Sequence, residues 1–319
     1  MKIKVGIIGG AGYTAGELLR LLINHPHVEI RFIHSKSNAD KFLYHVHDDL
    51  FGETDLKFSN TFNSDIDLVF LCVSHNEAEK LVSQFPSSVK IIDLSQDHRI
   101  NGKHSFVYGL PELNKERIKT ANYIANPGCF ATAIQLALLP LAKSELLHGD
   151  LYASCTTGST GAGQSLVETS HFSWRQNNLS VYKAFTHQHL LEINQSLLQL
   201  YKNYTGRLHI LPQRGSFTRG ILACITLKSD KALSDLQALY ESTYKDEAFV
   251  FLTPNGCHLK QVVNTNKCLL YLEKNEDNLL IVSVIDNLLK GASGQAVQNM
   301  NLMFGLPETI GLKLKPSAF

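Results

Sequence analysis

Residues 2–33, KIKVGIIGGAGYTAGELLRLLINHPHVEIRFI, decide the fold. Residues 2–8 are apolar enough to predict a buried strand, and a glycine-rich turn and a helix-like segment at residues 17–24 follow them. Residues 28–33 predict a second strand. A strand, a glycine turn, a helix and a strand within about 30 residues form the opening unit of a dinucleotide-binding fold.

The glycine turn between the first strand and the first helix is a candidate cofactor site. Glycine lets the backbone approach a pyrophosphate, and the N-terminus of the following helix favours its negative charge. The spacing Gly10-x-Gly12-x-x-x-Gly16 departs from the usual GxGxxG, but its position between a strand and a helix supports the interpretation. The candidate cofactor-binding residues of the turn are Gly9, Gly10, Ala11, Gly12, Tyr13 and Thr14.

The end of the second strand indicates which dinucleotide binds. An NAD site usually has a carboxylate there, about 20 residues after the glycines, to hold the ribose 2′-hydroxyl. This chain has His34-Ser35-Lys36-Ser37 instead. A lysine between two hydroxyl groups suits a 2′-phosphate, so Ser35, Lys36 and Ser37 predict a preference for NADP. The alternative is an ordinary polar loop.

The alternation of strands and helices continues to about residue 126 and then changes. Strand-like runs at residues 67–73, 89–94 and 123–126 predict an α/β domain with a Rossmann-type, doubly wound parallel sheet. Beyond residue 148 the strand-like runs come closer together, which predicts a second, α+β domain with a mixed or antiparallel sheet. We expect an NADP-binding domain of residues 1–148 plus a C-terminal helix at 292–319, and a catalytic and dimerisation domain of residues 149–291.

Cys129 is the candidate nucleophile, in the run Asn126-Pro127-Gly128-Cys129-Phe130-Ala131-Thr132. Residues 132–139 predict a buried helix that Pro140 interrupts or ends, so the cysteine lies at or near a helix N-terminus. Free N–H groups and the helix dipole can lower a cysteine pKa there from about 8.5 into roughly the 3.5–7.5 range. A buried apolar role is the alternative for this cysteine, and Cys257, beside a histidine, is the alternative nucleophile.

Two histidines and two arginines are further candidates. His187 and His189 precede an apolar-periodic helix, from which one imidazole can exchange protons near neutral pH; the alternative is capping or a surface pair. Arg99 and Arg214 are candidates for binding a substrate carboxylate or phosphate, weighed against ordinary surface arginines. The small-residue loop at residues 159–163 is either a close approach to a ligand or a flexible turn.

Composition argues against several classes of partner. The 319 residues carry a formal net charge of +1, so no charge excess favours nucleic acid or a membrane. The six cysteines show neither CxxC pairing nor a secreted-domain framework, which predicts a cytoplasmic protein. His45 and His47 are not accompanied by a third cluster at ligand spacing, so we expect a solvated loop there and no metal.

The chain resembles, almost from end to end, the N-acetyl-γ-glutamyl-phosphate reductase family of the aspartate-semialdehyde dehydrogenase superfamily. The cysteine segment, residues 124–140, fits the family pattern at every position. The other matching segments are GGAGYTAG (9–16), DLSQDHR (93–99), YGLPEL (108–113), GAG (161–163) and DNLLKGA (286–292). The sequence departs from the family where His-x-His-x-Pro-Glu-Ile reads HQHLLEI (187–193), and where Ser-Gly-Ala-Gly reads STGAG (159–163).

The resemblance implies an oxidoreductase that uses NADPH to reduce N-acetyl-L-glutamyl 5-phosphate, a small-molecule acyl phosphate, to its 5-semialdehyde in arginine biosynthesis. It implies a thioester on Cys129 and proton exchange by a histidine, for which we favour His189 over His187. The remaining site residues are Gly161 and Asn287 at the cofactor, and Arg99, Asn126 and Arg214 at the substrate. Such a protein is expected to be a homodimer or homotetramer.

Two other functions stay open at this point. A sibling enzyme would reduce N-succinylglutamyl phosphate, a carrier-bound aminoadipyl phosphate or aspartyl phosphate, because the choice of acyl group depends on the shape of the pocket. No run of lysine or arginine supports a carrier-protein substrate. A non-catalytic NADP sensor on the same fold would need neither Cys129 nor the histidine pair, so their presence favours an enzyme.

Overall fold

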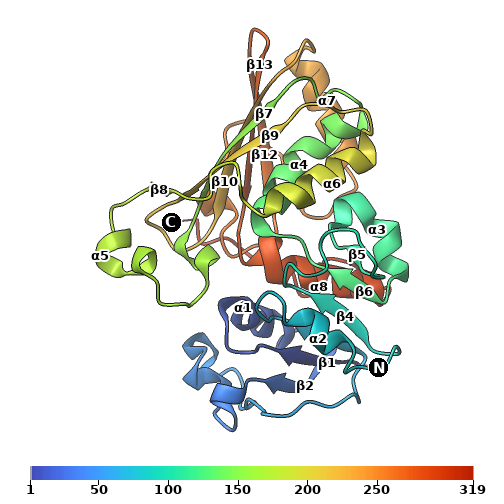
Figure 1. Cartoon of the computed structure of the whole chain (residues 1–319), viewed down its shortest axis with the longest axis vertical. Helices are drawn as coiled ribbons and strands as arrows, with labels where there is room; N and C mark the ends of the chain where they lie inside the picture. Colours follow the sequence, from blue (N-terminus) through green and yellow to red (C-terminus); the bar gives the residue numbers. More distant parts are fainter. Residues whose placement is uncertain (1, 319) are drawn as a thin grey trace. The chain divides into compact units, whose positions relative to one another are not determined.

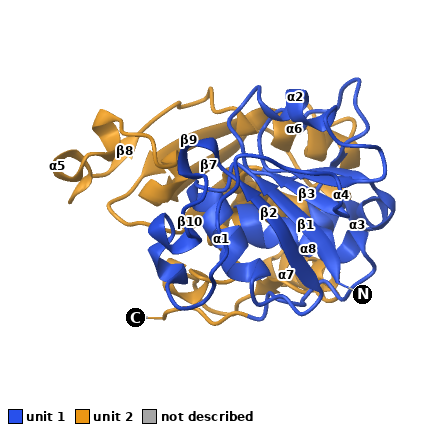
Figure 2. Ribbon diagram, turned by 90° about the horizontal axis from the view of Figure 1, so that it is seen from below, with its two compact units in different colours: residues 1–127, 292–313 blue, residues 128–291, 314–319 orange. Residues whose placement is uncertain are grey.

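A computed structural model describes residues 2–318, and the chain divides into two compact units (Figures 1 and 2). The first unit consists of Met1–Pro127 and Ala292–Lys313, and the second of Gly128–Gly291 and Leu314–Phe319. This division falls before residue 128, not at the expected 148, because the helix that begins at Cys129 packs within the second unit. None of the helices formed by residues 2–318 has the length and apolar character needed to cross a membrane.

The first unit is built on a parallel sheet with the strand order β2-β1-β3-β4-β6-β5, which confirms the predicted doubly wound architecture. Its strands are β1 (Ile3–Ile8), β2 (Val28–His34), β3 (Leu68–Leu71), β4 (Lys90–Asp93), β5 (Val107–Tyr108) and β6 (Tyr123–Ala125). Its helices are α1 (Tyr13–Leu22), α2 (Ala78–Val82), α3 (Pro111–Thr120) and α8 (Gly294–Met303).

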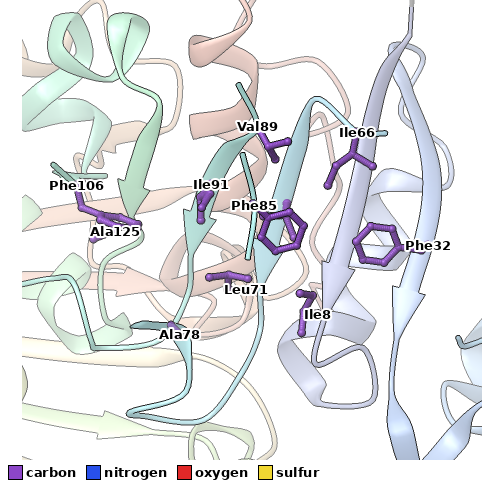
Figure 3. Close-up of a cluster of buried hydrophobic side chains, with 11 residues drawn as sticks. Ile8, Phe32, Ile66, Leu71, Ala78, Phe85, Val89, Ile91, Phe106 and Ala125 are labelled. Atoms are coloured by element: carbon purple, nitrogen blue, oxygen red, sulfur yellow. The ribbon is translucent and has the colours of Figure 1, made fainter. Parts of the chain in front are cut away.

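Apolar packing against this sheet fixes the strand register that places the glycine turn beside the end of β2. Figure 3 shows Ile8, Phe32, Leu71 and Ile91 in one cluster of buried side chains. Burying each such side chain stabilises the fold by about 1.5–3 kcal/mol, so a slipped register would be costly. In the register observed, Ile8 pairs with His34, and the carboxyl ends of β1 and β2 therefore lie side by side.

Neither β5 nor α3 was predicted from the sequence. The helix α3 has the sequence PELNKERIKT and buries only Pro111, Asn114 and Ile118, so it lacks the apolar period that identifies a helix. Pro111 stands at its first turn, where a missing N–H costs nothing. Packing against α8, which is far away in the sequence, supports this mostly polar helix.

The second unit contains a mixed sheet with the strand order β11-β12-β13-β10-β7-β9-β8, as predicted. The pairs β11–β12 and β7–β9 are parallel, and the other neighbours are antiparallel. Its strands are β7 (Leu151–Thr157), β8 (Ser180–Val181), β9 (Leu208–Arg214), β10 (Ile221–Lys228), β11 (Val250–Leu252), β12 (Cys268–Asn275) and β13 (Asn278–Ile285). Its helices are α4 (Cys129–Lys143), α5 (Phe172–Arg175), α6 (His189–Leu200) and α7 (Leu233–Tyr244).

Helices α4, α6 and α7 pack together over the mixed sheet (Figure 1). The central helix α4 contacts β10, β12 and β13, and α6 lies along α4. Buried residues alternate along β7 with the strand period of two, because one face of the sheet carries the core. This packing sets the start of α4 against the start of α6, and the candidate nucleophile and histidines lie at these two helix starts.

Of the two expected effects of Pro140, that it interrupts or ends the cysteine helix, the second is wrong. The helix α4 continues through Pro140 to Lys143. A proline inside a helix deprives the carbonyl four residues earlier of its hydrogen bond. Here the hydroxyl of Tyr244 donates to that carbonyl, Leu136 O, and the hydroxyl of Tyr240 donates to the next one, Ala137 O. Two tyrosines of α7 thus complete the backbone hydrogen bonding that the proline disrupts.

Replacing Tyr244 with phenylalanine is expected to lower the free energy of unfolding by about 1–3 kcal/mol, because it leaves the buried Leu136 carbonyl without this donor. Denaturant or thermal unfolding of the purified variant measures the change. Tyr152→Phe, at a tyrosine that is 53% exposed, is the control and should leave stability nearly unchanged. Equal stability of Tyr244→Phe and the natural chain would contradict this account of α4.

Candidate functional site

The glycine turn in the first unit presents the N-terminus of α1. Gly9 has φ +83°, and a Cβ atom there would lie 2.2 Å from the carbonyl oxygen of Cys72, so only glycine fits. Gly12 precedes the first residue of α1, and a Cβ atom at Gly12 would have no heavy atom within 4 Å. The turn is therefore close-packed against β3 on one side and open at the helix start, which suits a bound pyrophosphate.

His47 lies beneath this turn, contrary to the solvated loop that we expected. Its side chain is 6% exposed, and its Nε2 is 2.8 Å from the carbonyl oxygen of Gly10. A Cβ atom at Gly16 would lie 2.7 Å from His47 Nδ1, so this glycine makes room for the ring. Within residues 2–318, no group of three His, Cys, Asp or Glu side chains could hold a metal ion.

The segment after β2 forms a short 3₁₀ turn, Lys36–Asn38. Ser35 is buried and precedes the turn, whereas Lys36 and Ser37 are exposed. The side-chain amide nitrogen of Asn38 lies 3.3 Å from Ser35 Oγ and 3.2 Å from Ser37 Oγ, which holds the two hydroxyl groups around the lysine. Burial, together with the charge of Lys36, lowers the pKa of His34, so that its imidazole is neutral at neutral pH.

Arg99 and Asn126, two predicted substrate residues, belong to the first unit and make contacts that shape its backbone. Arg99 donates through Nε to Asn126 O and through Nη2 to Leu94 O, each at 2.9 Å. The Asn126 side chain donates to Ala292 O at 3.0 Å and accepts from Asn299 Nδ2 at 3.1 Å. Both side chains therefore brace the end of β6, just before the cysteine turn.

Cys129 is the first residue of α4. Two glycines adjoin it, Gly128 in the chain and Gly291 by contact. The Gly128 N–H donates to Glu192 Oε2 at 2.9 Å. A Cβ atom at Gly291 would lie 2.7 Å from the Cβ atom of Cys129. The buried Glu192 carboxylate and the neighbouring Gly291 thus fix the backbone that carries the half-buried Cys129 thiol.

The two predicted histidines lie together beside this turn. The His189 ring covers Gly128, where a Cβ atom would lie 2.3 Å from His189 Nε2. The ring centroids of His187 and His189 are 4.5 Å apart, and His187 Nδ1 accepts the His189 backbone N–H at 3.2 Å. Burial, with the charges of Lys183 and Arg214, lowers the pKa of His187 to about 4, so that its imidazole is neutral at neutral pH.

Arg214 approaches the same histidine from β9. Its guanidinium lies 4.5 Å from the centroid of the Tyr182 ring, and its backbone pairs with Thr157 on β7. Arg214 Nε and Thr157 Oγ1 are buried and have no hydrogen-bond partner in the described part of the chain. Burial and the Cys129 sulfur raise the pKa of Tyr182 to about 12, so its hydroxyl stays protonated. Arg214 Nε can donate a hydrogen bond to a ligand, and the Thr157 hydroxyl can donate or accept one.

Gly161 and Asn287, the remaining predicted cofactor residues, belong to one loop network in the second unit. Gly161 lies in the 3₁₀ turn Ser159–Ala162, where a Cβ atom would lie 3.4 Å from Thr157 Oγ1. The Asn287 side chain donates to Thr160 Oγ1 at 3.0 Å and accepts the Gly220 N–H at 2.7 Å. The side chain of Asn287 thus fixes the small-residue loop.

Burial suppresses ionisation of four of the other cysteines. Burial raises the pKa of Cys72 to about 12 and the pKa of Cys257 to about 11. Burial also raises the pKa values of Cys155 and Cys224. Cys257, the alternative nucleophile, directs its sulfur toward backbone carbonyls of the sheet, 3.9 Å from Leu269 O. These cysteines therefore remain thiols at neutral pH.

Three residues that adjoin the nucleophile or the histidines were not among the predicted site residues, namely Tyr182, Glu192 and Gly291, although Glu192 lies in the histidine segment that resembles the family. A signal was present for Glu192, which follows His189 by three residues on a predicted helix and must therefore lie on the same face. Tyr182 and Gly291 meet the site through contacts distant in sequence, which local patterns do not reveal.

Comparison with known proteins identifies two families along the chain. "Semialdehyde dehydrogenase, NAD binding domain" matches residues 4–121, and "Semialdehyde dehydrogenase, dimerisation domain" matches residues 129–287. The N-acetyl-gamma-glutamyl-phosphate reductases of Parabacteroides distasonis and Christiangramia forsetii are 59% and 57% identical to this chain. Each alignment covers 99% of this chain and 100% of the relative.

Solved structures share the fold at much lower sequence identity. Aspartate semialdehyde dehydrogenase II of Vibrio cholerae, complexed with ASA, superposes with a TM-score of 0.74 at 14% identity, covering 96% of this chain and 99% of that one. The Candida albicans aspartate semialdehyde dehydrogenase with NADP gives a TM-score of 0.70 at 14% identity, covering 97% and 100% of the two chains.

Proposed function

The chain belongs to the N-acetyl-γ-glutamyl-phosphate reductase family, and from this premise we propose that it reduces N-acetyl-L-glutamyl 5-phosphate to the 5-semialdehyde and phosphate in arginine biosynthesis. The observation that carries the proposal is the geometry at Cys129. A cysteine at the first position of α4, with an imidazole over the preceding glycine, is suited to form and release a thioester.

The chemistry begins with attack of the Cys129 sulfur on the acyl carbon of the substrate. The bond from that carbon to the phosphate oxygen breaks, and phosphate leaves as a thioester forms on the sulfur. A bound nicotinamide dinucleotide supplies the hydride that reduces the thioester carbonyl. The resulting hemithioacetal on Cys129 then loses its hydroxyl proton, and the carbon–sulfur bond breaks to release the aldehyde and restore the sulfur.

His189 is the proposed acid and base in these steps, because its ring covers Gly128 beside the nucleophile. His187 is less suited to accept a proton, since burial and two nearby cations lower its pKa to about 4. Its Nδ1 also accepts the His189 backbone N–H. We assign His187 to orienting His189, in line with the preference for His189 that the sequence suggests.

Arg214 is the proposed anion-binding residue of the second unit. Its Nε and the neighbouring Thr157 Oγ1 are buried polar atoms that need a hydrogen-bond partner, and a substrate carboxylate or phosphate would supply one. Arg99 and Asn126 use side-chain groups to brace the strand end before the cysteine turn. We therefore propose that Arg99 and Asn126 position the cysteine turn. Arg99 also contributes a positive charge.

The proposed cofactor is NADP, held by the glycine turn and by the segment after β2. The open N-terminus of α1 suits the pyrophosphate, and the exposed Lys36, with Ser35 and Ser37, suits a 2′-phosphate. Gly161 and Asn287 are proposed to serve the cofactor through the loop that Asn287 holds.

Replacing Lys36 with alanine is expected to raise the KM for NADPH by about tenfold or more, because a charge-assisted bond to a phosphate contributes about 1.5–3 kcal/mol. The KM for NADH should stay nearly the same. Steady-state kinetics with both cofactors measure the effect, and Lys2→Ala, at another exposed lysine of the first unit, is the control. A KM for NADH far below that for NADPH in the natural protein would overturn the proposed preference.

The reverse reaction tests the proposed function. N-acetylglutamate 5-semialdehyde, NADP and phosphate should give a rise in absorbance at the wavelength of NADPH, and omission of phosphate should abolish it. The same assay with N-succinylglutamate 5-semialdehyde and with carrier-bound aminoadipate semialdehyde ranks these substrates against the N-acetyl compound. Faster turnover of either analogue would identify a sibling reductase, and no phosphate-dependent turnover of any substrate would refute the proposal.

The proposed assembly is a homodimer or homotetramer, and the matching family of the second unit is described as a dimerisation domain. Light scattering coupled to size-exclusion chromatography measures its mass. The proposed location is the cytoplasm, where thiol chemistry of this kind operates under reducing conditions.

A further inference from the structure

Glu192 joins the backbone of the nucleophile to the proposed acid and base. The carboxylate is 2% exposed and lies on the first turn of α6. One oxygen accepts the Gly128 N–H at 2.9 Å, and the other lies 3.9 Å from His189 Nε2. A single buried carboxylate therefore contacts both groups that the proposed reaction requires to be aligned.

We propose that Glu192 is a positioning residue that fixes the peptide before Cys129 and holds His189 in the orientation and charge state that the thioester chemistry needs. This inference rests on the proposed function of the same site. A buried carboxylate requires hydrogen bonds or an opposite charge, because burial of an uncompensated charge is costly. The Gly128 N–H supplies the first, and a protonated His189 supplies the second.

The charged groups around His189 differ in what they do to its proton. Glu192, on the same helix, favours the imidazolium. Cys129 on α4 favours it when the sulfur is a thiolate. Arg214 on β9 and Lys183, in the segment before α6, oppose protonation of the adjacent His187. These charges act differently on the two imidazoles. His187 stays neutral, and His189 is the histidine that can carry the proton.

Aromatic contacts reinforce this division of roles. Phe130, the residue after the nucleophile, has its ring centroid 5.3 Å from that of His187 and 6.2 Å from that of His189. Tyr182 packs 6.0 Å from His187 on another side. These rings exclude water from the imidazoles, which increases the effect of the nearby Glu192 carboxylate.

Glu192→Gln is the variant that separates charge from packing. The glutamine carbonyl oxygen can still accept the Gly128 N–H, but the negative charge beside His189 is lost. We expect the pKa of His189 to fall by about one unit or more and kcat at neutral pH to fall about tenfold or more. The limb of the kcat profile that reports His189 should move to lower pH by the same amount.

Histidine-ring NMR of the whole protein gives the pKa without substrate, and His189→Asn assigns the resonance. Glu241→Gln, which removes an exposed charge from α7, is the matched control and should change neither quantity. An unchanged His189 pKa in Glu192→Gln overturns the inference, whether kcat is retained or lost, since a loss would then reflect structure alone. Because the titration needs no turnover, its failure is distinct from failure of the proposed reaction.

Discussion

Replacing Cys129 with serine is expected to lower turnover by about 10⁴-fold or more, because removing an enzyme's nucleophile costs several orders of magnitude. A serine hydroxyl is a much weaker nucleophile at neutral pH, and an oxygen ester accepts hydride far less readily than a thioester. NADPH affinity should stay nearly the same, since the glycine turn and the Lys36 segment belong to the first unit. Turnover assays and fluorescence titration with NADPH measure the two quantities.

Cys257→Ser is the control for this experiment, because Cys257 is the other cysteine that the sequence proposes as a nucleophile. Its burial and raised pKa, about 11, predict nearly full activity for the variant. Full turnover by the Cys129 variant would refute the thioester mechanism. Loss of turnover in the Cys257 variant without loss of folding would transfer the role to that residue.

Gly128→Ala is the second change with a large expected effect. The new methyl group would lie 2.3 Å from His189 Nε2, so the imidazole, the cysteine turn or both must move. A displacement of about 1 Å at a reacting group can cost about 10²-fold in rate, and we expect a loss of that size in kcat. Steady-state kinetics measure the loss, and circular dichroism and thermal unfolding establish that the variant is folded.

Gly256→Ala provides the matched control in the same unit. A Cβ atom at this glycine would have no heavy atom within 4 Å, and its φ is not in the left-handed region. Alanine there should leave kcat unchanged. If Gly128→Ala retained full activity, the close approach of His189 to the nucleophile turn would have no part in catalysis.

Much of the fold follows from local pattern. The strands β1 and β2 and the mixed second sheet agree with the runs of apolar residues. The start of α1 was predicted too late, at residue 17 rather than Tyr13, because Gly16 suggested that the turn continued. That glycine instead lies inside the helix to accommodate His47, a residue 31 positions further along the chain. Local sequence carries no information about such a contact.

Local sequence likewise predicts part of the candidate site and misses the contacts between distant segments. Turn chemistry alone identified Cys129 at the start of a helix, and the structure has it there. The pairing of Thr157 with Arg214 depends on the register of β7 and β9, and the contact of Gly291 with Cys129 depends on how the chain returns after β13. Neither can be read from local sequence, because each joins residues that are more than 50 positions apart.

The burial of the remaining sulfur atoms has a consequence for chemical labelling. Electrophiles such as chloroacetamides react with thiolates, and the raised pKa values of Cys72, Cys155, Cys224 and Cys257 leave these side chains almost wholly protonated. Cys268 is buried as well. We therefore expect mild treatment with such an electrophile to modify Cys129, at the start of α4, in preference to the other cysteines, and the extent of modification would then count competent active sites.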